Sequence, residues 1–194
     1  MGGAYKSNLQ KCSNFSVSYF KIFKDKKIWI LTKLYITYVR PKIEYSTPVW
    51  SPSLKKDIQK IERIQKDFTR FACRKCSIPY SSYSDRLCKL NLQSLERRRI
   101  TNDLVFLFKT TRNLTGLNFD DYFVLRTHTY NFRGNKIQFF PKFTSTNTNW
   151  HNCFFSRVCR YWNKLGDEIK MAKTVDSFKN NVINADFSDD LMYL

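Results

Sequence analysis

The stretch from about residue 52 to residue 73 constrains the fold most, because one set of side chains recurs there at the spacing of an α-helix. At roughly 100° per residue, the recurring residues fill one side of such a helix. They are Leu54, Ile58, Ile61, Ile64, Gln65, Phe68, Phe71 and Ala72, while Lys55, Lys56, Lys60, Arg63, Lys66 and Arg70 fall on the opposite arc. The pattern predicts a helix with one buried and one basic face, with Ser51 as its N-cap and Pro52 as its first residue.

Two interpretations of the basic face are open. A helix that docks on a core through its apolar face can present the opposite charges to a phosphate backbone. The basic residues can equally form an ordinary solvated face, on which Asp57, Glu62 and Asp67 are local partners. The charge of the whole chain favours the first interpretation.

That charge points to an anionic partner. The 194 residues include 34 Lys and Arg against 16 Asp and Glu, a net charge of +18. Residues 1–100 hold 22 basic and 7 acidic side chains, net +15, whereas residues 101–194 hold 12 and 9, net +3. Self-repulsion of this size opposes compaction. Because neutralising phosphates releases counterions, nucleic acid is favoured over a basic protein whose charges only face solvent.

Other segments have the signals of shorter helices and of a hairpin. Gly116 is expected to break one helix, and Arg133–Lys136 to form a turn between strand-like residues 122–125 and 137–140. Caps and apolar spacing predict helices over residues 5–24, 26–39, 82–90, 95–111, 150–164 and 175–184, with Asp25 and Ser94 as N-caps and Pro41 as a stop. The expected fold class is mainly α: an irregular helical bundle with a small β-hairpin or extended lobe near residues 122–143.

Several short motifs also occur in the order typical of one protein family. Leu34–Trp50 contains a Leu-Tyr pair, a Val-Arg-Pro triplet, a Glu-Tyr pair and a Trp. The motifs that follow are Ser51-Pro52, Ile58–Ile64, Asp85–Leu87, Leu90–Leu92, Ser94–Arg98, Arg133-Gly134, Phe154–Val158, Trp162–Leu165, and Val175 with Ser177–Lys179. Over about residues 20–185 the chain resembles the thumb and post-thumb region of reverse transcriptases from non-LTR (LINE-type, jockey-like) retrotransposons.

The resemblance implies a helical region that grips RNA or an RNA–DNA hybrid through phosphates and adjoins a palm or fingers domain. It implies three segments: a basic helical thumb-like region (1–112), a linker with a possible β-hairpin (113–148) and a C-terminal helical segment (149–194). With the charge pattern, it gives a set of expected nucleic-acid contacts. They are Arg40, Lys42, Lys56, Lys60, Arg63, Lys66, Arg70, Arg97, Arg98, Arg133 and Arg157.

The chain lacks the catalytic carboxylates of such a polymerase. In the family, two adjacent aspartates in the palm precede the thumb and hold Mg²⁺ ions at the primer end. Asp189-Asp190 occurs at the wrong end of the chain, and Asp120-Asp121 lies between Phe119 and Tyr122 without a palm before it. We therefore expect no catalytic residue, no cofactor in this chain, and no polymerase activity from it alone.

The cysteines offer a weaker hypothesis. Cys73, Cys76 and Cys88 could begin a zinc site, but a fourth ligand would have to be the distant His128 or His151. Without a secretory signal the six cysteines are expected to be reduced, and no metal site is expected. With no signal peptide and no run of 18 apolar residues, we expect a nuclear or cytoplasmic protein that is not secreted and has no membrane partner.

Two alternatives stay open at this stage. The aromatic residues Tyr35, Tyr38, Tyr45 and Trp50 could stack on bases, although aromatic residues within helices more often lie in the core. The chain could also be a protein-interaction remnant that packs on a palm domain or a host partner without binding nucleic acid.

Overall fold

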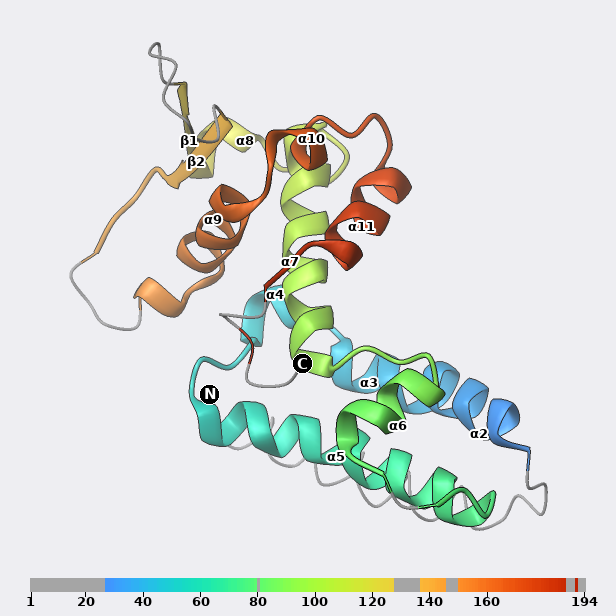
Figure 1. Cartoon of the computed structure of the whole chain (residues 1–194). Helices are drawn as coiled ribbons and strands as arrows, with labels where there is room; N and C mark the ends of the chain where they lie inside the picture. Colours follow the sequence, from blue (N-terminus) through green and yellow to red (C-terminus); the bar gives the residue numbers. More distant parts are fainter. Residues whose placement is uncertain (1–26, 80, 128–136, 146–149, 188–190, 192–194) are drawn as a thin grey trace. The chain divides into compact units, whose positions relative to one another are not determined.

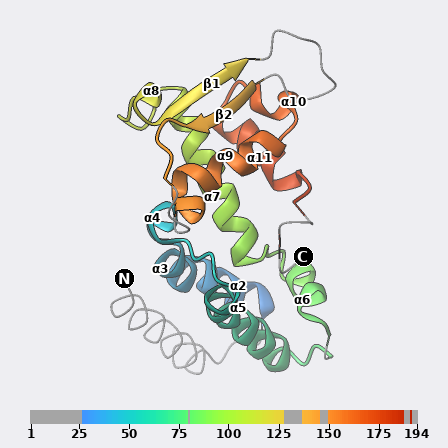
Figure 2. The same cartoon turned by 90° about the vertical axis from the view of Figure 1, so that its left-hand side faces the viewer.

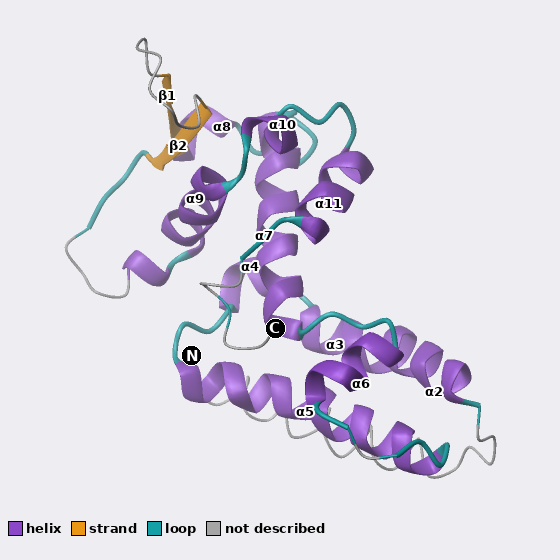
Figure 3. Ribbon diagram, in the orientation of Figure 1, coloured by secondary structure: helices purple, strands orange, loops and turns teal. Residues whose placement is uncertain are grey.

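The computed structural model describes residues 27–79, 81–127, 137–145, 150–187 and 191 (Figure 1). This part of the chain is mostly α-helical with one small two-stranded antiparallel sheet, as Figure 3 shows, which confirms the expected fold class. The chain forms two compact units. Within the described residues, unit 1 comprises 27–46, Pro52–Arg97 and Leu191, and unit 2 comprises Thr47–Ser51 and 98–187. The boundaries expected at residues 112 and 148 both lie within unit 2.

Unit 1 begins with a helical run that continues through a proline. Helix α2 (Ile28–Leu34) leads into a π-helical segment (Tyr35–Val39) and then into α3 (Arg40–Glu44). The expected stop at Pro41 is therefore wrong. A proline lacks an N–H and its ring clashes with the carbonyl four residues earlier. The preceding turn is widened, since the Arg40 N–H donates to the carbonyl of Tyr35 five residues back, and a wider turn can accommodate the ring.

The long basic helix predicted from the sequence is present, but it begins later. Helix α5 spans Lys55–Lys75, and Leu54 precedes it in an extended conformation. Ser51 is not its N-cap: the Ser51 N–H donates to the carbonyl of Thr47 at 2.9 Å, so Ser51 closes the short helix α4 (Thr47–Trp50). The apolar face of α5 is buried in unit 1, where Phe68 stacks on Tyr35 with ring centroids 4.2 Å apart.

Two further helices occur where the sequence predicted them, and Ser94, the predicted N-cap of the second, is confirmed. Helix α6 (Tyr83–Lys89) begins at Ser82, and α7 (Leu95–Thr111) begins at Ser94, whose hydroxyl accepts a hydrogen bond from the Arg97 N–H at 3.3 Å. The predicted range 95–111 of the second helix is confirmed, and Gly116 lies in the loop that follows it. The helix ends at Thr111, and Asn113 takes the left-handed conformation with φ 55°, which asparagine tolerates at helix ends.

The capping box of α6 predicts a pH-dependent contribution to stability. Ser82 Oγ accepts from the Asp85 N–H, and Asp85 Oδ2 accepts from the Ser82 N–H, both at 3.1 Å. The hydrogen bonds with Ser82 lower the pKa of Asp85. A carboxylate with a lowered pKa contributes stability above its unfolded-state pKa, and this is lost as the pH falls through the folded-state pKa.

We therefore expect Asp85→Asn to lower the urea midpoint at neutral pH and to leave it unchanged at about pH 2. Asp120→Asn, at an exposed position of the short helix α8 (Phe119–Tyr122), is the control and should change the midpoint little at either pH. Equal losses for Asp85→Asn at both pH values would show that the carboxylate charge is not what stabilises the cap.

Unit 2 packs a hairpin and several helices around an aromatic core. Its elements are the later part of α7, α8 (Phe119–Tyr122), β1 (Phe123–Thr127), β2 (Ile137–Pro141), a 3₁₀ turn (Trp150–Asn152), α9 (Phe154–Lys164), α10 (Asp167–Lys170) and α11 (Val175–Asn184). The strands pair antiparallel with Leu125 opposite Phe139, so the predicted hairpin strands are confirmed. The predicted turn Arg133–Lys136 and the predicted helix 5–24 lie outside the described residues.

Specific contacts hold the hairpin and α11 in unit 2, where α9 lies beside the sheet in both views (Figures 1 and 2). Trp162 of α9 stacks on Phe139 of β2 with centroids 4.7 Å apart. The Asn163 side chain donates to the Phe139 carbonyl and accepts from its N–H, each at 2.9 Å. Phe108 of α7 stacks on Phe178 of α11 at 4.2 Å. Trp162 is thus a core residue, as expected for an aromatic within a helix.

Candidate nucleic-acid interface

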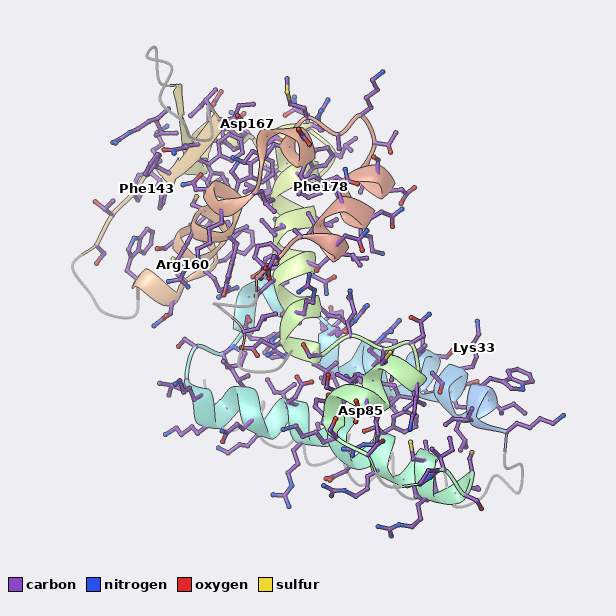
Figure 4. The ribbon with its side chains drawn as sticks, in the orientation of Figure 1. Lys33, Asp85, Phe143, Arg160, Asp167 and Phe178 are labelled. Carbon is purple, nitrogen blue, oxygen red and sulfur yellow. The ribbon has the colours of Figure 1, made fainter. Side chains whose placement is uncertain are left out.

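The outer side of α5 carries a continuous row of basic residues. At 100° and 1.5 Å per residue, they fall within an arc of about 120° and extend over about 27 Å of the helix. Figure 4 shows nitrogen-bearing side chains extending outward from α5. Lys66 is half-buried and the others are exposed. We call this surface the α5 basic face, and it consists of Lys56, Lys60, Arg63, Lys66, Arg70 and Arg74.

Arg74 was not among the expected contacts. The predicted helix ended at residue 73, whereas α5 continues to Lys75 and places Arg74 on the same arc as Lys56 and Arg63. The basic residues that directly follow the apolar repeat were the signal for a longer helix, because cations are favourable in the last turn.

Acidic neighbours neutralise the α5 basic face only in part. Lys60 Nζ lies 2.9 Å from Asp57 Oδ1, and Asp67 lies 3.8 Å from Arg63 and 3.4 Å from Arg70. These pairs are largely exposed, so each contributes at most about 1 kcal/mol and can be exchanged for a phosphate contact. The six basic residues therefore keep a net positive charge.

Glu62, one of the local partners in the solvated-face interpretation, does not lie on the exposed side of α5. It is fully buried, and its carboxylate caps the start of α7. Oε1 accepts from the Leu95 N–H at 3.1 Å, and Oε2 accepts from the Glu96 N–H at 3.2 Å. A carboxylate is favourable there, because the first N–H groups of a helix lack partners and carry partial positive charge.

A buried polar network extends from this carboxylate beneath α5. The Tyr83 hydroxyl donates to Glu62 Oε1, and burial followed by the charge of Glu62 raises the pKa of Tyr83, so the phenol stays protonated. Gln65 accepts from the Tyr35 hydroxyl at 2.9 Å and donates to the Tyr83 oxygen at 3.1 Å and to the Gln93 carbonyl at 2.9 Å. The network joins α2–α3, α5, α6 and α7 and so fixes the helix that carries the basic face.

The expected contacts on α3 and α7 differ in exposure. Lys42 is exposed, whereas Arg40 is half-buried and lies 4.0 Å from Glu44. Arg97 and Arg98 are half-buried, and the adjacent Arg99 is buried. The three consecutive arginines therefore do not share one face, which is the expected result of 100° steps along a helix. Arg133 lies outside the described residues.

Arg157 has a structural role inside unit 2, and we remove it from the interface. Its Nε donates to Asp103 Oδ2 at 2.9 Å. Its terminal nitrogens donate to the carbonyls of Asn152 at 2.9 Å and Pro48 at 3.3 Å. Burial raises the pKa of Asp103, and the charge of Arg157 opposes that rise. Since Arg157 is buried and holds three chain segments together, it does not present its charge to a ligand.

The aromatic candidates for base stacking divide between core and surface. Tyr35 is fully buried, which agrees with the core interpretation, and Trp50 is half-buried. Tyr38 and Tyr45 are 52% and 78% exposed, and Trp29 is 63% exposed.

The described residues show no metal centre. Among them, no group of three or more His, Cys, Asp or Glu side chains is placed to hold a metal ion. Burial raises the pKa of both Cys73 and Cys76, which disfavours the thiolates that zinc needs. Asp120 and Asp121 are exposed on α8, whereas His128 and Asp189-Asp190 lie outside the described residues.

Comparisons with known proteins add one similarity. The chain is 29% identical over 125 residues to an uncharacterized protein from Caenorhabditis elegans; this covers 63% of the chain and 59% of that relative's length. No protein-family model and no solved structure matches the chain. In the described residues, no helix has the length and apolar character needed to cross a lipid bilayer. The fold and the basic face thus define a mainly helical, strongly basic protein.

Proposed function

We propose that this chain binds RNA or an RNA–DNA hybrid through phosphate contacts, as the non-catalytic thumb and post-thumb portion of a non-LTR retrotransposon reverse transcriptase. The observation that carries the proposal is the α5 basic face, with six basic residues on one arc of a rigidly packed helix. Contacts from such a surface go to phosphates and carry little sequence information.

The packing of α5 supports this proposal. A phosphate-binding helix must be held firmly, and the apolar face of α5 is buried while Glu62 and Gln65 beneath it bond to neighbouring segments. The length of the face, about 27 Å, is enough to follow several successive phosphates of a strand. The order of the short motifs resembles that of the reverse-transcriptase thumb. This resemblance is the reason for proposing RNA or an RNA–DNA hybrid as the nucleic acid.

We propose polymerase activity only for a longer protein that would contain this chain together with a palm domain. The chain lacks the palm aspartates of the family, so we expect it to bind but not to extend a primer. A primer-extension assay on the purified chain should give no product, and synthesis that depends on Asp189 would contradict this expectation.

Salt dependence tests the binding proposal directly. If the six residues of the α5 basic face contact phosphates, affinity for an RNA–DNA hybrid should fall roughly 10³-fold between about 50 and 200 mM salt. Fluorescence anisotropy of a labelled hybrid and of a labelled single-stranded RNA would measure this fall. Affinity that does not change with salt, or no binding at about 50 mM salt, would overturn the proposal.

A second candidate function, packing on a palm domain or another protein, has a separate observation in its favour. Trp29 and Tyr38 are exposed along the helical run of α2 and its π-helical extension, and aromatic residues are enriched in protein interfaces. Under this function, Trp29→Ala should weaken capture of the partner, whereas charge changes on the α5 basic face should leave it intact.

A further inference from the structure

A pocket lies within unit 1 where α5 ends and α6 begins. Its volume is about 210 Å³. Three arginines surround it: Arg70 and Arg74 come from the α5 basic face, and Arg86 comes from α6. The remaining lining residues are Cys73, Ile78, Pro79 and Ser81.

Arg86 is the unusual member of this set, because it is buried and forms no ion pair with any carboxylate among the described residues. Arg86 is only 4% exposed. Nε donates to Thr69 Oγ1 at 3.2 Å, one terminal nitrogen donates to the Ser81 carbonyl, and the guanidinium lies 5.7 Å from the centre of the Tyr83 ring.

The neighbouring groups supply only part of the missing negative charge, since the Asp85 carboxylate is attracted to Arg86 without forming an ion pair with it. Asp85 is exposed and uses its carboxylate to cap the Ser82 N–H. Cys73 stays a neutral thiol, because burial raises its pKa although Arg86 and Lys89 oppose the rise. Asp67 pairs with Arg70 at the surface. Two N–H groups of the guanidinium are used by Thr69 and the Ser81 carbonyl, and its other donors can bond to an anion that enters the pocket.

Two further features fit an anionic ligand. Ser81 lines the pocket, and its buried Oγ has no hydrogen-bond partner among the described residues, so a rotation of this hydroxyl would give a ligand oxygen a donor. The last carbonyls of α5 would repel an anion if they were unpaired. Two of them are bonded, because the Cys76 N–H donates to the Ala72 carbonyl at 3.1 Å and the Ile78 N–H donates to the Cys73 carbonyl at 2.9 Å.

We propose that this pocket binds the terminal phosphate of a nucleic acid strand, an inference that rests on the proposed function. Arg70 and Arg74 belong both to the α5 basic face and to the pocket, so a strand that follows the face arrives at the pocket. A terminal phosphate monoester carries a charge of about −2 near neutral pH. It is linked to a nucleoside on one side only and can enter a recess, whereas an internal phosphodiester is flanked on both sides.

The test compares three oligonucleotides of one sequence with the full chain. One has a 5′-phosphate, one a 3′-phosphate, and one has hydroxyls at both ends. Anisotropy competition should show that one phosphorylated form binds about tenfold more tightly than the hydroxyl form, as expected for added charge-assisted hydrogen bonds. Arg74→Gln and Ser81→Ala, at the exposed rim and at the wall, should each reduce this preference.

Lys56→Gln is the matched control, because it removes the same charge from the α5 basic face away from the pocket. It should weaken all three oligonucleotides equally and keep the preference. Equal binding of the three oligonucleotides, or a preference that Arg74→Gln and Ser81→Ala leave unchanged, overturns the terminal-phosphate site alone. No binding of any of them at low salt overturns the proposed function and this site with it.

Discussion

Reversing the charge of Lys56, Lys60 and Arg63 to glutamate should reduce the affinity for an RNA–DNA hybrid by at least about 100-fold at low salt. These residues are exposed on neighbouring turns of α5 and make only surface pairs with Asp57 and Asp67. Each substitution removes a phosphate contact and adds repulsion, so the loss should exceed that of neutral substitutions. Anisotropy titration with a labelled hybrid would measure it.

The salt dependence should change together with the affinity. Each lost phosphate contact lowers the slope of log affinity against log salt by roughly 0.9 for a duplex, so three lost contacts should lower it by about 2.7. A triple variant with weaker binding but an unchanged slope would indicate that the substitutions act through something other than phosphate contacts.

A second triple variant separates a local interface from the effect of total charge. Arg160, Lys173 and Lys179 are exposed in unit 2, and Figure 4 labels Arg160. Reversing them changes the net charge from +18 by the same amount, yet it should reduce affinity much less. Equal losses for the two variants would show that binding is a general effect of charge, and would remove the α5 basic face as the interface. Circular dichroism checks that both variants are folded.

Local patterns predicted those parts of the fold that depend on neighbours along the chain. The three- and four-residue repeat of α5 predicted its buried face, and Ser94 marked the start of α7 because capping involves residues only three positions apart. The predicted helix stop at Pro41 was wrong, because the widened turn before it makes room for the proline ring, which would clash with a carbonyl in a regular α-helix. Ser51 failed as an N-cap because it already ended the short helix α4.

The candidate site was predictable in its exposed charges but not in its buried ones. The positions of Lys56, Lys60 and Arg63 on one arc follow from helical spacing alone. The burial of Arg157 and Glu62 depends on Asp103, 54 residues away, and on Leu95, 33 residues away. The sequence nonetheless contains a signal for this burial. Arg157 and Glu62 each lie at helical spacing from the apolar residues of their own helix, and a charge on such a buried face needs a buried partner.

Removing the Glu62 carboxylate should cause the largest loss of stability. Glu62→Ala would leave the Leu95 and Glu96 N–H groups and the Tyr83 hydroxyl without their acceptor. Each buried unsatisfied donor costs about 1–3 kcal/mol, so we expect the free energy of unfolding to fall by about 3–5 kcal/mol. This is a large share of the roughly 5–15 kcal/mol of a typical domain, so unit 1 should be partly unfolded at 37 °C. Urea denaturation followed by far-ultraviolet circular dichroism would measure the change.

Asp67→Ala is the matched control, since it removes one carboxylate from the exposed side of the same helix. Its pairs with Arg63 and Arg70 are surface pairs, so the free energy of unfolding should change by no more than about 0.5 kcal/mol. Tyr83→Phe should fall between the two, because it removes a single hydrogen bond and leaves the N–H groups of α7 paired. If Glu62→Ala proved as mild as Asp67→Ala, the carboxylate would not hold the start of α7. The basic face of α5 would then need another explanation for its fixed position.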